Sequence, residues 1–118
     1  MFADEDLIYS YSRSQALADG VLIDISERAR QNGIRYATAC TAGLWALIES
    51  IPEPDRDMRD VAEAVRISAV LSAMLDVIRK ARGTDRVEFV ALGTELYAVC
   101  GPGDTEAPVI TIMLEGED

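Results

Sequence analysis

The chain has 118 residues, of which 49% are hydrophobic and 27% are charged, so it has the size and composition of one globular domain (residues 1–118) and not of a disordered segment. Twenty-one acidic residues outnumber eleven basic ones, and the formal net charge is −10 at pH 7. Such a charge repels nucleic acid and anionic membranes, so we expect a protein partner with a basic surface, no direct nucleic-acid binding and no membrane binding.

The N-terminal third predicts two short helices separated by a strand. A serine cap and a following glycine delimit the first helix, at about 13–19. The apolar, β-branched run at 21–25 predicts a short strand or a buried extended segment. The second helix, at 26–32, begins with a capping serine and ends at an Asn-Gly pair.

A third helix is predicted at 38–50, where apolar side chains recur at helical spacing and Thr38 and Thr41 are candidate caps. Two prolines, Pro52 and Pro54, then break the chain, because each lacks an amide donor and disfavours a helical residue before it.

The longest element is a predicted helix at about 57–82, with acids in its first turns and bases in its last, as the helix dipole prefers. Gly83 is positioned to end it. Between residues 67 and 78 nearly every face is apolar or small, which indicates a helix covered on more than one side, or one that packs against a second subunit.

The C-terminal third predicts three strands, at 86–92, 95–100 and 108–114, joined by a tight Gly-Thr turn and a longer glycine-proline connection. The sequence therefore predicts an α+β fold, in which a three-stranded antiparallel sheet (about 86–114) packs on a long central helix (about 57–82) and on shorter N-terminal helices.

Localisation and thiol state follow from what the chain lacks. No apolar run reaches the roughly 18 to 20 residues that cross a bilayer, and the first residues are acidic where a signal peptide is basic. We therefore expect a cytoplasmic protein. Cys40 and Cys100 have no neighbouring Cys or His, and we expect free, buried thiols.

The composition argues against catalysis, because the chain has no histidine, the commonest general base and metal ligand. His-dependent triads are excluded, and Lys80, the only lysine, has no placed serine beside it. Residues 101–104 lack the Lys-Ser/Thr of a phosphate loop and predict a turn. We expect no enzyme, and no catalytic, cofactor-binding or metal-binding residues.

The aromatic residues allow two interpretations. Tyr36 and Trp45, together with Tyr9 and Tyr11, could form a recognition surface, because aromatic side chains dominate interface hot spots. They could equally belong to the core, and with only two phenylalanines in the chain we favour burial.

The acids suggest a docking site for a basic partner. Asp57, Asp60 and Glu63 follow one another at three-residue steps in the predicted long helix, where Arg56, Arg59 and Arg66 are expected to pair with them. Residues 101–118 contain no base. The candidate partner-binding residues are therefore the helix acids and four C-terminal acids: Asp57, Asp60, Glu63, Asp104, Glu106, Glu115 and Glu117.

Segments 6–16, 19–27 and 101–114 resemble a family of short acidic proteins of unassigned activity carried by bacterial plasmids, integrative elements and phages. The resemblance brings no catalytic residue. By analogy with other small acidic proteins of mobile elements, it implies an anti-defence inhibitor of the anti-CRISPR or antirestriction type, which occupies a basic nucleic-acid-binding surface of a host defence complex. The alternative is a non-enzymatic accessory or regulatory protein of the element that forms a homodimer through the long helix.

Overall fold

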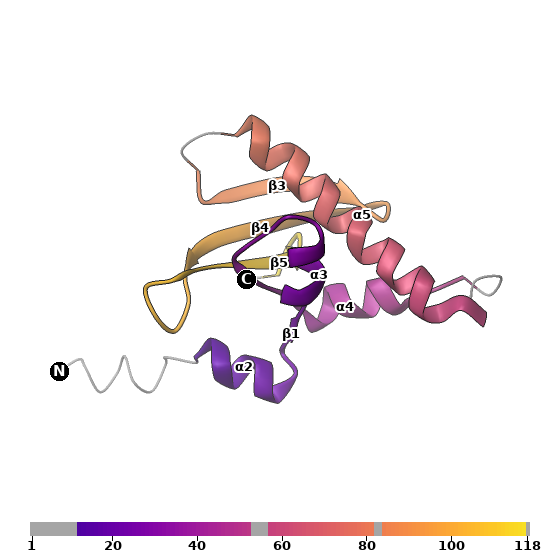
Figure 1. Cartoon of the computed structure of the whole chain (residues 1–118), viewed down its shortest axis with the longest axis horizontal. Helices are drawn as coiled ribbons and strands as arrows, with labels where there is room; N and C mark the ends of the chain where they lie inside the picture. Colours follow the sequence, from indigo (N-terminus) through magenta and orange to yellow (C-terminus); the bar gives the residue numbers. More distant parts are fainter. Residues whose placement is uncertain (1–11, 53–56, 82–83, 118) are drawn as a thin grey trace.

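The structure, a computed structural model, describes residues 12–52, 57–81 and 84–117. Helices and a five-stranded mixed sheet form an α+β fold, in which the longest helix crosses one face of the sheet (Figure 1). The elements in chain order are α2 (Arg13–Asp19), β1 (Leu22–Asp24), α3 (Ser26–Gln31), β2 (Ala37–Thr41), α4 (Ala42–Glu49), α5 (Arg59–Lys80), β3 (Arg86–Ala91), β4 (Thr94–Pro102) and β5 (Pro108–Leu114).

The strand order is β1-β2-β5-β4-β3, with β2 parallel to β5 and every other pair antiparallel. The predicted meander of β3, β4 and β5 is confirmed. The prediction of a three-stranded, wholly antiparallel sheet is wrong, because β1 and β2 add two strands on the far side of β5. Local turn signals reveal a hairpin, whereas a parallel partner distant in the sequence leaves no such signal.

The prediction of a helix over 38–50 is wrong for its first four residues, which belong to β2. Thr38 and Cys40 are fully buried and are paired in register with Ile110 and Ile112 of β5. These ladder bonds and the burial outweigh the local preference for a helix. The helix α4 begins after Thr41, whose hydroxyl accepts a hydrogen bond from the amide of Leu44 at 3.2 Å.

The other element boundaries agree with the sequence to within a few residues. Ser12 and Gln15 form a reciprocal capping box at the start of α2, and Gly20 ends this helix in the left-handed conformation, at φ 78°. The turn between β3 and β4 has positive φ at Leu92 and Gly93, which suits the twist of a two-residue hairpin. Gly83, the predicted end of the long helix, lies outside the described residues.

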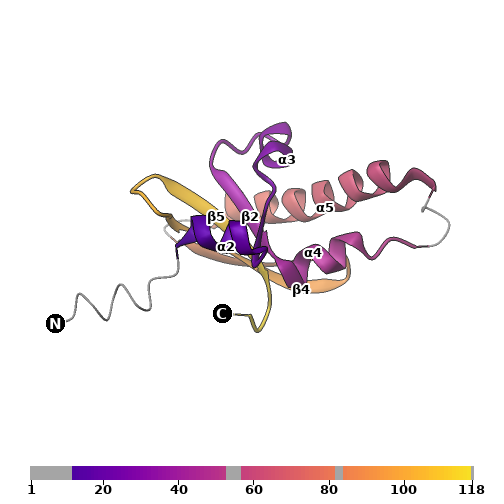
Figure 2. The same cartoon turned by 90° about the horizontal axis from the view of Figure 1, so that it is seen from below.

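The core lies between α5 and the sheet. The buried stripe of α5, at helical spacing, consists of Ile67, Val70, Leu71 and Met74, and it belongs to one apolar cluster with strand residues such as Phe89 and Ile112. Figure 2 shows α3 and α5 on one side of the sheet and the chain after β5 on the other. No helix among the described residues is long and apolar enough to span a membrane.

Replacing Leu71 by alanine should lower the free energy of unfolding by about 2 to 5 kcal/mol, because this fully buried side chain leaves a cavity under α5. Val65→Ala on the exposed side of the same helix is the matched control and should change stability by no more than about 0.5 kcal/mol. Urea unfolding followed by circular dichroism measures both, and equal losses for the two variants would contradict the packing of α5.

Candidate functional site

The seven candidate acids lie in separate regions of the molecule. Asp57, Asp60 and Glu63 lie at the start of α5, whereas Asp104 and Glu106 lie in the connection from β4 to β5. Figure 1 places this connection and the start of α5 at opposite ends of the long axis. The acids therefore do not form one continuous patch.

Asp104 holds the start of α2 against the sheet. Its two carboxylate oxygens accept hydrogen bonds from the backbone amides of Arg13 and Ser14, at 2.7 and 2.9 Å. The Arg13 guanidinium in turn donates to Thr111 Oγ1 and to the carbonyl of Ile110, at 2.6 and 2.9 Å. Partial burial lowers the pKa of Arg13, although the negative charges of Asp24 and Asp104 oppose this shift. The Asp104 carboxylate is thus occupied by intramolecular bonds.

Glu117 fixes the chain after β5 to the start of α4. Its carboxylate accepts hydrogen bonds from the Thr41 hydroxyl at 2.7 Å and from the Leu114 amide at 2.9 Å, and its carbonyl accepts one from the Tyr97 hydroxyl. A Cβ atom at Gly43 would lie only 2.9 Å from Glu117 Oε2, so glycine gives this carboxylate room. Glu117 is therefore structural as well as acidic.

The remaining C-terminal acids are exposed. Glu115 forms an ion pair with Arg86 at 3.4 Å, and Arg86 also lies over the ring of Tyr97 and 3.7 Å from Glu88. Glu106 has no ion pair within the described ranges. Among the C-terminal candidates, Glu106 thus differs from the other three in having no partner in the described structure.

Two of the three arginines expected to pair with the acids at the start of α5 contact other groups. Arg66 donates to the carbonyls of Leu47 and Ile48 at the end of α4, both at 2.8 Å, and Arg59 pairs with Glu49 at 3.6 Å. The prediction that these two arginines pair with the helix acids is wrong, and Arg56 lies outside the described residues. In the described part of the chain, Asp57, Asp60 and Glu63 form no ion pair.

Exposed apolar side chains lie beside these acids. Met58, Val61 and Val65 are 61%, 55% and 62% exposed, and their spacing places them on the solvent side of α5, opposite its buried stripe. Asp57 and Asp60 flank them, and Glu63 lies further around the helix and is half-buried. We call Asp57, Met58, Asp60, Val61 and Val65 the α5 face.

The α5 face continues into a shallow groove of about 460 Å³, lined also by Pro52, Ala62, Arg66, Ala69 and Leu92. A helical wheel separates Val61 and Val65 from the buried stripe, because Val61 lies about half a turn from Val70 and Val65 about half a turn from Met74. Apolar residues at helical spacing do not by themselves distinguish this exposed face from the buried stripe, so the face was not predicted.

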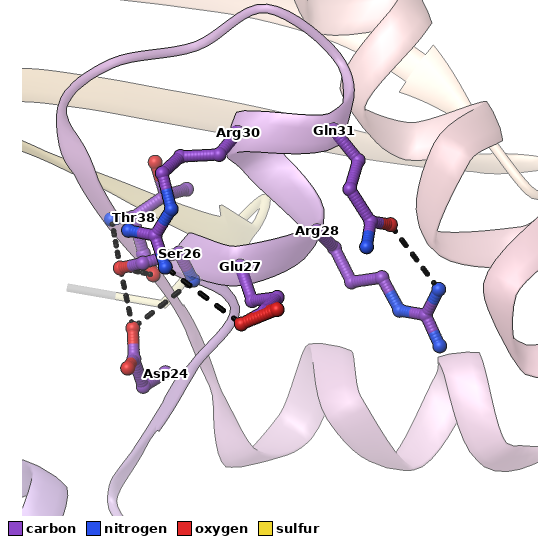
Figure 3. A network of polar contacts seen from close by, with 7 residues as sticks. All are labelled: Asp24, Ser26, Glu27, Arg28, Arg30, Gln31 and Thr38. Carbon is purple, nitrogen blue, oxygen red and sulfur yellow. Dashed lines mark hydrogen bonds and ion pairs between the residues drawn. The ribbon is translucent and has the colours of Figure 1, made fainter.

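Two arginines lie beside the α5 face, and among the described residues neither pairs with its acids: Arg66 lines the groove and contacts α4, and Arg28 belongs to α3. Arg28 borders the face but donates to Gln31 at 3.3 Å, and Arg30 pairs with Glu27 at 3.8 Å (Figure 3). In the same network Ser26 Oγ donates to Asp24 and accepts from the Thr38 amide, at 2.5 and 2.9 Å, which ties α3 to β2. These contacts are structural.

The predicted aromatic residues divide between core and surface. Trp45 is half-buried against the core cluster, as favoured, whereas Tyr36 is 48% exposed. Tyr9 and Tyr11 lie outside the described residues.

The described residues contain no group of three or more Cys, Asp or Glu side chains placed to hold a metal ion. Cys40 and Cys100 are both free thiols, with Cys40 buried and Cys100 half-buried.

No protein-family model, curated protein or solved structure matches the chain. Of the predicted site, the α5 face is the part where acids without an ion pair among the described residues lie next to exposed apolar side chains.

Replacing Asp104 by alanine should loosen α2, because two backbone amides at its start lose a charged acceptor, a loss of about 1 to 2 kcal/mol. We expect amide exchange within residues 13–19 to accelerate roughly tenfold by mass spectrometry. Glu106→Ala, two residues away and without a described partner, is the control and should leave exchange unchanged. Equal exchange in both variants would contradict the structural role of Asp104.

Proposed function

We propose that this protein acts by stoichiometric binding to a partner with a basic surface, and that the α5 face is the contact. The observation that supports this proposal is that three exposed apolar side chains lie beside Asp57 and Asp60. These two acids have no ion-pair partner in the described ranges. Stable interfaces combine a desolvated apolar centre with a charged rim. The α5 face has both parts.

The charge indicates what kind of partner fits. With a net charge of −10, the protein attracts basic surfaces over a distance, and the rim acids then fix the orientation of the complex. The resemblance to small acidic proteins of mobile elements makes the basic nucleic-acid-binding surface of a host defence complex our leading candidate. Binding there would exclude nucleic acid by occupancy, as anti-CRISPR and antirestriction inhibitors do.

Reversing the charge at Asp57 and Asp60 should weaken partner binding at least tenfold at low salt, because two attractive rim contacts become repulsive. The double variant Asp57→Lys and Asp60→Lys is compared with Glu88→Lys and Glu95→Lys, which changes the net charge equally at exposed acids on β3 and β4. Affinity capture from cells carrying defence systems, repeated at two salt concentrations, identifies the partner, and titration of the purified partner measures the affinity.

Two results would contradict the proposal. An equal loss in both double variants would mean that net charge alone matters, and unchanged binding in the α5 variant would exclude this face. Circular dichroism checks that each variant remains folded, since lysine at a helix start opposes the dipole.

We propose self-association through α5 as the second candidate, for a homodimeric accessory role. The observation that favours it is the charge gradient of the helix, with Asp60 in the first turn and Arg79 and Lys80 in the last. Two antiparallel copies would place each acidic end beside a basic end, with Val61 and Val65 between the helices.

Sedimentation velocity separates the two candidates. A homodimer predicts a concentration-dependent shift to twice the mass in the micromolar range, abolished by Val61→Glu with Val65→Glu and kept in Val90→Glu, which alters an exposed valine on β3. A single monomeric species throughout would exclude the homodimer. A stable dimer would bury the α5 face and contradict the leading proposal.

A further inference from the structure

A cleft of about 360 Å³ lies near the other end of α5, between this helix, the connection from α3 to β2, and the sheet. Its apolar lining comes from Leu75 and Ile78 of α5, from Ile34 after α3, and from Val87, Ala98 and Ile110 of the sheet. Its volume is within the range of about 300 to 1,000 Å³ that is typical of small-molecule sites, and such sites are predominantly apolar.

Apolar surface in this cleft remains open to water. Ile78 is 37% exposed and Tyr36, which also lines the cleft, is 48% exposed. A ligand that covered these side chains would gain the free energy of removing apolar surface from water. The cleft therefore favours a ligand with an apolar side chain.

Two residues of opposite charge line the cleft. Arg35 comes from the connection after α3 and Asp85 from the residue before β3, and both are exposed. Among the described residues neither side chain forms an ion pair or hydrogen bond, with the other or with any third group. At the end of α5, Lys80 forms an ion pair with Asp76 at 3.3 Å.

From these groups we infer that the cleft binds a free α-amino acid with an apolar side chain, such as leucine or phenylalanine. The side chain lies among Leu75, Ile78 and Ile110, the carboxylate is held by the Arg35 fork, and the ammonium group is held by Asp85. An apolar anion or an apolar cation would satisfy one charge and be repelled by the other, so the zwitterion fits best.

The thiol of Cys100 can report on ligand binding in this cleft. Cys100 lines the cleft and is half-buried, whereas Cys40 is buried in the core. Burial, and to a smaller extent the charge of Glu117, raises the pKa of Cys40 to about 12, so this thiol stays protonated and unreactive at pH 8. Only Cys100 should react with Ellman's reagent in the native protein.

Bound leucine or phenylalanine should slow the labelling of Cys100 at least fivefold at saturation, because the ligand covers the thiol. Three matched probes test the zwitterion: 4-methylpentanoate lacks the ammonium group of leucine, 3-methylbutylamine lacks the carboxylate, and serine lacks the apolar side chain. We expect little protection from any of them. Amide chemical-shift changes at residues 33–36 and 84–87 on titration provide a second measurement that does not depend on the thiol.

Arg35→Gln and Asp85→Asn should each weaken leucine binding at least tenfold, while Arg30→Gln and Glu88→Gln, at exposed sites outside the cleft, should leave it unchanged. Equal binding of 4-methylpentanoate and leucine, with tighter binding in Asp85→Asn, would overturn the zwitterion in favour of an anion. The absence of protection and of shift changes with both amino acids would overturn the site. The Asp57→Lys, Asp60→Lys variant should bind leucine normally, so failure here and failure of the α5 face are distinguishable.

Discussion

The parallel pairing of β2 with β5 is the constraint on which the rest of the structure depends. It joins the N-terminal half of the chain to the C-terminal meander, with register from Ala37↔Val109 to Cys40↔Ile112, and it buries Thr38 and Cys40 beside β5. Because β5 also pairs with β4, it lies in the middle of the sheet. The chain on either side of β5 is thereby brought against the N-terminal helices, and this places Asp104 at α2 and Glu117 at α4.

This arrangement changes the meaning of the acidic C-terminus. By composition, residues 101–118 contain acids and no base, which indicates a free negative patch. In the fold, the Asp104 carboxylate accepts hydrogen bonds from two backbone amides at the start of α2. The Glu117 carboxylate accepts one from the hydroxyl of Thr41, the residue that caps α4. The absence of basic partners therefore does not mean that these carboxylates are free, because backbone amides and hydroxyls also satisfy them.

The sequence predicted those features that depend on neighbours in the chain. The caps of α2, the stripe of α5 and the hairpin of β3 and β4 all follow from residues within a few positions of one another. It failed where distant segments decide the outcome. The local sequence around Thr38 and Cys40 predicts the start of a helix, and the backbone pairing with β5 makes this segment a strand instead. The spacing of Arg66 from nearby acids predicts ion pairs with them. In the fold its guanidinium instead donates hydrogen bonds to the carbonyls of Leu47 and Ile48 in α4.

The same logic explains why the α5 face carries the candidate docking site. An acid at a helix start is stabilised by the dipole, whether it comes from the helix itself or from a distant segment. At α2 the acid is Asp104, from the connection between β4 and β5, and backbone amides of α2 donate to its carboxylate. At α4 the acid is Glu117, from the chain after β5, and the Thr41 hydroxyl donates to its carboxylate. At α5, Asp60 belongs to the helix and Asp57 to the turn before it, and both residues are exposed next to Val61. Net charge attracts a basic partner, but the fold decides which carboxylates can meet it.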